Sequence, residues 1–243
     1  MSGKGMRYTY DGTFEGYLCA VLAALRSGKV PQSITDRRLE YDHDDSINVP
    51  TNLRDAQYLY SVISAKSSAE VQQMAADYFL TDSSGLEINL YRMIFSSLTY
   101  GARIAEDYSS ELMSGIQMAI RDLYREAQSI FQDMDFYLGE EATCQVLNPR
   151  NSVLPIIRTP LLKRRDIDNL IVYDKRHHLL LERYAGQSML LDISAFPIPE
   201  FKNPAEAYSY LWPFIKERRF DIRVSSMQKK SGSAMEPLWL KAS

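Results

Sequence analysis

The chain has 243 residues and a formal net charge of −3, and 45% of its residues are hydrophobic. This composition is typical of a globular protein and excludes a disordered or fibrous chain. Its longest apolar runs are much shorter than the roughly 20 residues that a membrane span needs. The N-terminus lacks the apolar stretch of a signal peptide, and Cys19 and Cys144 are too few for a disulfide framework. We therefore expect a cytoplasmic protein.

The first part of the chain predicts one strand followed by helices. Residues 7–11 are β-prone, and residues 14–26 have apolar side chains at helical spacing with Thr13 as the expected N-cap. Residues 31–50 are expected to be irregular, with one short strand. Further helices are expected over residues 52–65, 68–82, 87–108 and 110–131, which together form a helical block at about 52–136.

The second part predicts a small sheet. Strands are expected at residues 142–147, 169–174, 179–184 and 188–193, and helices at 153–162 and 203–218, the first interrupted by Pro155 and Pro160. The two middle strands flank Lys175-Arg176-His177-His178, which predicts a hairpin. The fold class is α+β: a small, mainly antiparallel sheet with flanking helices and a helical block inserted after the first strand. We expect a single domain over residues 1–243, with a basic α+β portion at about 140–243.

The charges are unevenly distributed along the chain. From Gln145 onwards there are 16 Lys and Arg residues against 10 Asp and Glu, and before it 12 against 21. The basic clusters Lys163-Arg164-Arg165, Lys175-Arg176 and Lys229-Lys230 are candidates for contacts with DNA phosphates. The same clusters also fit an ordinary solvated surface. Both interpretations stay open.

Several segments resemble a bacterial family known as probable DNA-metabolism proteins. Tyr10-Asp11-Gly12-Thr13-Phe14-Glu15-Gly16 is similar to the family's aromatic-Asp-Gly-Ser/Thr-Phe-Glu-Gly start. Arg125-Glu126-Ala127 resembles its Arg-Glu-Ala-His helix, with Gln128 in place of the histidine. Residues 151–155 resemble its Asn-Val-Leu-Pro element, and residues 169–176 its Trp-x-Ile-Tyr-Asp-x-x-Arg strand and turn. The C-terminal segment is only loosely similar.

The resemblance implies a role in DNA repair or modification. Family members are encoded beside a radical-SAM protein, and some are fused to a uracil-DNA glycosylase domain. The implied partners are therefore DNA and a uracil-DNA glycosylase or radical-SAM protein, and the resemblance provides no active-site assignment.

The sequence contains no Gly-rich phosphate loop, zinc-protease motif, Cys-x-x-Cys or nucleophile elbow. We therefore expect neither a cofactor nor a metal, and interpret His177-His178 as a solvated turn.

The candidate catalytic residues are Asp11, Glu15, Asn151 and Asp174. Cleavage of an N-glycosidic bond needs a carboxylate that activates water and stabilises the developing positive charge, together with side chains that hold the extruded base. Asp174 is either this carboxylate or a turn former. Asp11 and Glu15 either border a site or stabilise a helix start. Asn151 either contacts a base or water, or caps the next helix.

The sequence thus favours a DNA N-glycosylase-like enzyme that flips out and excises a damaged or modified base, in repair or antiviral defence. The competing hypothesis is a non-catalytic DNA-binding accessory to a separate glycosylase or radical-SAM enzyme. A third hypothesis is a structural role without contact to DNA. None of the three involves a membrane.

Overall fold

The computed structural model describes residues 5–38, 45–106 and 110–217, with the backbone alone at 104–106. These residues form two compact units, and the division lies between Arg121 and Asp122, within helix α5 (Glu111–Gln132). The sequence predicted a single domain over residues 1–243. The division into two compact units does not test this expectation, which stays a prediction.

The first unit contains a three-stranded parallel sheet. Its strands are β1 (Arg7–Tyr10), β2 (Ser33–Asp36) and β3 (Ser46–Asn48), in the order β2-β1-β3. Two strands therefore lie in the segment where the sequence predicted one, because β3 is too short to show an alternating pattern. All three strands are parallel, so their carboxyl ends lie at one edge of the sheet.

The helices of the first unit begin where the sequence predicts them. They are α1 (Phe14–Ser27), α2 (Leu53–Lys66), α3 (Ala69–Phe79), α4 (Leu86–Tyr100) and the 3-10 helix η1 (Gly101–Glu106). The side chains of Thr13, Asn52 and Ser68 cap the first three by accepting backbone N–H bonds. The expected helix to residue 108 instead stops at Tyr100, because Gly101 adopts a φ of 76° and a 3-10 turn follows.

The second unit contains a five-stranded sheet. Its elements are β4 (Tyr137–Leu138), β5 (Thr143–Leu147), α6 (Leu154–Leu162), β6 (Leu170–Asp174), β7 (Leu179–Tyr184), β8 (Gln187–Asp192) and α7 (Pro204–Lys216). The order is β4-β5-β6-β7-β8, and only β5 and β6 are parallel. The predicted hairpin of β6 and β7 is confirmed. So is the α+β class, although β1 belongs to the separate parallel sheet.

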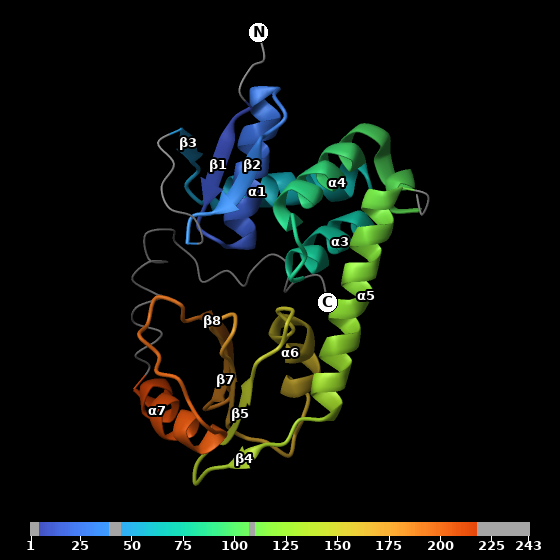
Figure 1. Cartoon of the computed structure of the whole chain (residues 1–243). Coiled ribbons are helices and arrows are strands. Elements are labelled where there is room, and N and C mark those ends of the chain that lie inside the picture. The colour runs from blue at the N-terminus through green and yellow to red at the C-terminus, as the bar shows by residue number, and fades with distance from the viewer. Residues whose placement is uncertain (1–4, 39–44, 107–109, 218–243) are drawn as a thin grey trace. The chain divides into compact units, whose positions relative to one another are not determined.

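Helices cover both faces of the second sheet (Figure 1). Trp212 and Leu211 of α7 pack on Cys144, Ile171 and Leu180 on one face, and α6 lies against β7 on the other. The predicted interruption of α6 does not occur. Pro155 lies in its first turn, where a missing N–H costs nothing, and Pro160 lies in its last turn.

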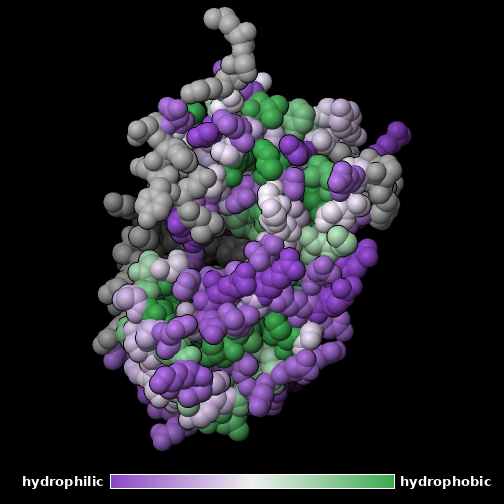
Figure 2. Space-filling view, viewed as in Figure 1, coloured by the Kyte–Doolittle hydropathy of each residue, from purple (hydrophilic) through white to green (hydrophobic). Residues whose placement is uncertain are grey.

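Within the described residues, no helix has both the length and the hydrophobicity required to cross a membrane. On the face that Figure 2 shows, hydrophilic residues make up most of the described surface, with small hydrophobic groups among them.

Candidate functional site

A hollow of about 710 Å³ lies in the second unit where β5 ends. It is lined by Asp122, Arg125, Glu126, Ser129 and Ile130 of α5 and by the segment Val146–Asn151. We call it the carboxyl-edge hollow. Because β5 and β6 are parallel and Leu147 pairs with Asp174, the turn after β6 begins at the same edge. Loops that follow the carboxyl ends of parallel strands are a common place for ligand sites.

Glu126 fixes one wall of the hollow to the other. Its Oε1 accepts the backbone N–H of Arg150 (2.6 Å), and its Oε2 accepts both the backbone N–H (3.0 Å) and the side-chain Nδ2 (2.7 Å) of Asn151. Glu126 is half-buried. Three short bonds to one carboxylate hold the loop before α6 against α5.

Exposed cations lie at two places on the wall of the hollow and at a third place beside it. Arg125 and Arg150 line it, and the backbone N–H of Lys175 donates to the carbonyl of Leu147 (3.0 Å), which places the turn after β6 beside it. Arg125 forms an ion pair with Asp122 at 2.9 Å on the helix surface. The two carboxylates of the hollow thus bind groups of the protein itself. Arg150 and Lys175 are exposed.

The sequence predicted Asp174 to be either a catalytic carboxylate or a turn former, and the residue lies inside the turn between β6 and β7. It is 0% exposed. One carboxylate oxygen accepts the N–H groups of Arg176 and His177, each at 3.1 Å, and the other lies 2.8 Å from Nδ1 of His177. This geometry is typical of a turn former, and a substrate reaches the carboxylate only if the turn opens.

Asn151 is also buried, with 6% of its surface exposed. The residue that caps α6 is Val153, which makes no side-chain capping bond. Asn151 instead binds Glu126 through its amide nitrogen. Its position is therefore set by contact with α5 rather than by a capping role.

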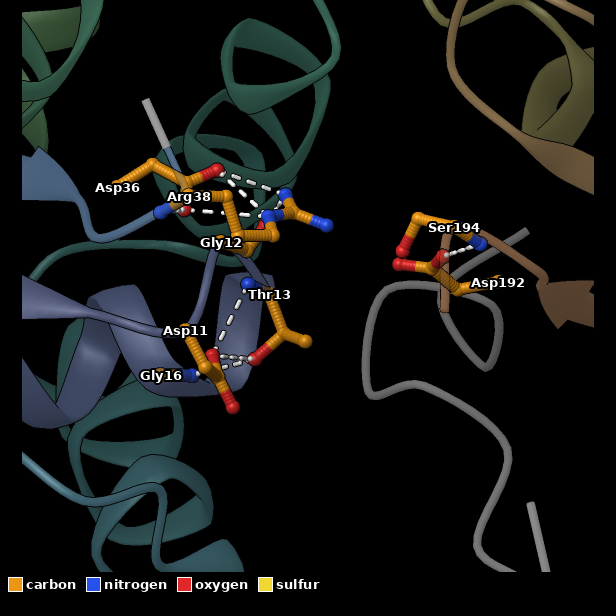
Figure 3. A network of polar contacts seen from close by, with 8 residues as sticks. All are labelled: Asp11, Gly12, Thr13, Gly16, Asp36, Arg38, Asp192 and Ser194. Carbon is orange, nitrogen blue, oxygen red and sulfur yellow. Dashed lines mark hydrogen bonds and ion pairs between the residues drawn. The ribbon is translucent and has the colours of Figure 1, made fainter. Parts of the chain in front are cut away.

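Asp11 belongs to a separate polar network in the first unit (Figure 3). Its Oδ1 accepts the backbone N–H (3.0 Å) and the hydroxyl (2.6 Å) of Thr13, and its Oδ2 accepts the hydroxyl of Thr51 (2.7 Å). Thr13 Oγ1 in turn accepts the N–H of Gly16 (3.0 Å). The half-buried Glu15 lies beside this network, in the first turn of α1.

The other side of this turn is held by Arg38. Its guanidinium binds the buried Asp36 carboxylate through Nε (2.9 Å) and Nη2 (2.7 Å), and donates from Nη2 to the carbonyl of Gly12 (3.2 Å). Gly12 has a φ of 81°, a conformation that favours glycine. The Asp11-Gly12-Thr13 segment is thus a tightly bonded turn.

The four catalytic candidates are divided between the two units. Asp11 and Glu15 lie in the first unit, whereas Asn151 and Asp174 lie in the second. Within the second unit, Asn151 lies in the loop after β5, and Asp174 is the last residue of the neighbouring parallel strand β6.

The basic clusters are also separated. Lys163, Arg164 and Arg165 lie before β6, where the Arg164 carbonyl accepts a bond from Arg183, the register partner of Leu170. Lys175 and Arg176 follow β6, about 13 Å of strand away. Lys229 and Lys230 lie outside the described residues. Of the residues counted from Gln145 onwards, six of the 16 basic residues, these two included, and two of the 10 acidic residues lie there.

Arg164 is occupied by intramolecular contacts. It binds Asp166 through Nη2 (2.6 Å) and Nε (3.2 Å), and its guanidinium lies 5.2 Å from the ring centroid of Phe136. The bond to Asp166 raises the pKa of Arg164, and the same bond lowers the pKa of Asp166. Within the predicted cluster, Lys163 and Arg165 are exposed, whereas Arg164 is half-buried.

Cysteine and metal chemistry find no support in the described part of the chain. Cys19 and Cys144 are free and buried, and burial raises the pKa of the Cys144 thiol to about 12, which disfavours a nucleophilic thiolate. No group of three His, Cys, Asp or Glu residues that could hold a metal ion occurs within the described ranges, which do not include His43.

Sequence reasoning missed the main residues of the hollow. Glu126 was noted only as part of the Arg125-Glu126-Ala127 segment, and Arg150 was not singled out at all. The one available signal was that three of the resembling segments contain Glu126, Asn151 and Asp174, which the fold brings to one edge.

Comparison of this chain with family models, with curated proteins and with solved structures finds no match. The family resemblance therefore rests on the short segments alone and stays a prediction.

Proposed function

We propose that this protein binds DNA at the carboxyl-edge hollow and acts as a non-catalytic accessory to a separate base-processing enzyme. One observation supports this most strongly: Arg125 and Arg150 line a hollow whose carboxylates are bound by the protein's own groups, and the backbone of Lys175 is bonded to Leu147 at its edge. Exposed cations at fixed positions are the main source of affinity for a phosphate backbone. The family resemblance directs the proposal to DNA.

The state of the candidate carboxylates favours binding over catalysis. Asp174 is fully buried, and both Asp174 and Asp11 accept several hydrogen bonds from neighbouring residues. A general base must reach the proton that it removes, directly or through one water molecule. In the folded turn, Asp174 does not meet this requirement.

Removing the two edge cations should weaken DNA binding. We expect the double variant Arg150→Ala/Lys175→Ala to bind a short duplex about tenfold more weakly, with a salt dependence flatter by about two phosphate contacts. The measurement is fluorescence anisotropy of labelled duplex between about 50 and 200 mM salt.

The matched control is Lys163→Ala/Arg165→Ala, which removes the same charge from exposed positions before β6. We expect its affinity to stay close to that of the wild type. Equal weakening by both pairs would indicate an unspecific charge effect. Unchanged binding in Arg150→Ala/Lys175→Ala would exclude the hollow as the DNA site.

Excision of a base is the second candidate function, and the place of Asn151 among the residues that line the hollow favours it. An enzyme that acts on a base must hold the flipped nucleotide in a pocket. The hollow has a volume of about 710 Å³ and is wide open to solvent. Asn151 would then contact the base or a water molecule next to it.

A cleavage assay separates the two functions. The protein is incubated with DNA that carries uracil, alkylated or glucosylated bases, and alkali then breaks the strand at any abasic site. Under the accessory proposal we expect salt-dependent binding without strand breaks. Breaks that depend on the modified base, and that disappear in Asp174→Asn while binding persists, would favour base excision instead.

A further inference from the structure

Resting on the proposed DNA-binding function, we infer that Glu126 is a positioning residue that presents Arg150 to a phosphate group. Glu126 belongs to α5, whereas Arg150 belongs to the loop after β5. The bond joins the Glu126 carboxylate to the backbone N–H of Arg150, so it fixes the loop backbone that carries this cation relative to Arg125, the neighbour of Glu126 on the helix. A cation held in place binds a phosphate at a lower entropic cost than one on a free loop.

Both oxygens of Glu126 are needed for this contact. Oε1 accepts from the backbone of Arg150, and Oε2 accepts twice from Asn151. In Glu126→Gln the amide group has one oxygen, so its nitrogen must face a backbone or side-chain N–H. The orientation that keeps both bonds to Asn151 places the amide nitrogen against the N–H of Arg150. The substitution therefore releases Arg150 with little change in side-chain volume.

Because Glu126 is negatively charged, the direction in which its substitution changes DNA affinity separates two explanations. Removing a negative charge near a phosphate backbone should by itself strengthen DNA binding. Loss of positioning should weaken it. The same substitution therefore has opposite expected results. Affinity rises if Glu126 acts only through its charge, and it falls if Glu126 positions Arg150.

We expect Glu126→Gln to bind a short DNA duplex about threefold more weakly than the wild type, with a salt dependence reduced by about one contact. The matched control is Glu140→Gln, an exposed position before β5 that loses the same charge. Its affinity should be unchanged or slightly higher. Glu126→Asp retains the charge but is too short to bridge Arg150 and Asn151, and it should weaken binding as well.

A double-mutant cycle tests whether Glu126 acts through Arg150. In an Arg150→Ala background, Glu126→Gln should no longer weaken binding, because the group that it positions is gone. Stability is followed by urea unfolding, and affinity is compared only among variants that are folded. If Glu126→Gln does not fold, Glu126→Asp replaces it in the cycle.

Two outcomes would overturn the inference: stronger binding by Glu126→Gln, or equal weakening in the presence and absence of the Arg150 side chain. Failure of the proposed function is seen separately, as absence of salt-dependent DNA binding by the wild type. In that case hydrogen exchange without DNA still tests the positioning. The Arg150 amide should exchange faster in Glu126→Gln, and an unchanged rate would contradict it.

Discussion

Asp174→Ala is expected to lower the free energy of unfolding of the second unit by about 3 kcal/mol, because it removes a fully buried carboxylate from its donors. The N–H groups of Arg176 and His177 and the His177 ring lose their acceptor. The turn also contains His178 with a φ of 54°, which a non-glycine residue adopts only when its surroundings hold it. Urea unfolding followed by Trp212 fluorescence measures the loss, since Trp212 is buried in this unit.

Asp192→Ala is the control for Asp174→Ala. Asp192 ends β8 and accepts the N–H of Ser194 at 2.9 Å, but it is exposed (Figure 3). We expect this variant to lose less than about 1 kcal/mol. A similarly small loss in Asp174→Ala would mean that the turn does not depend on the carboxylate. Asp174 would then be available for the catalytic role that the sequence suggested.

The helix starts could be predicted because their signals are local. Thr13, Asn52, Ser68 and Asn203 each accept a backbone N–H from a residue two or three positions further along the chain. Such bonds depend on neighbouring residues and are therefore visible in a short window of sequence. The hairpin of β6 and β7 is predictable for the same reason.

The carboxyl-edge hollow could not be predicted because it depends on distant contacts. Glu126 and Asn151 are 25 residues apart, and no spacing rule connects a helix residue with a loop at that separation. The parallel pairing of β5 and β6 is equally non-local, since a strand sequence does not specify its neighbour. The distance between the basic clusters is also set by the fold, since β6 separates Lys163 from Lys175.

Gly16→Ala is expected to destabilise the first unit by about 3 kcal/mol, although alanine is the better helix former by about 1 kcal/mol. Gly16 lies in the first turn of α1, and a Cβ atom there would lie 2.2 Å from Oδ1 of Asp11 and 2.7 Å from Oγ1 of Thr51. Both atoms are held by hydrogen bonds within the network around Asp11, so neither can move without breaking one. Urea unfolding followed by far-ultraviolet circular dichroism gives the change in stability.

Gly115→Ala is the control, and it is expected to change stability in the opposite direction to Gly16→Ala. Gly115 lies in α5, where an added Cβ meets no atom within 4 Å, so the substitution should stabilise the protein by about 0.5–1 kcal/mol. If Gly16→Ala were also stabilising, the Asp11 network would be free to rearrange, and Asp11 could serve a substrate. If Gly16→Ala destabilises the protein and Gly115→Ala stabilises it, the turn requires glycine at position 16 for packing. The Asp-Gly-Thr-Phe-Glu-Gly segment would then have a structural role in the first unit. The carboxyl-edge hollow of the second unit would remain the candidate functional site.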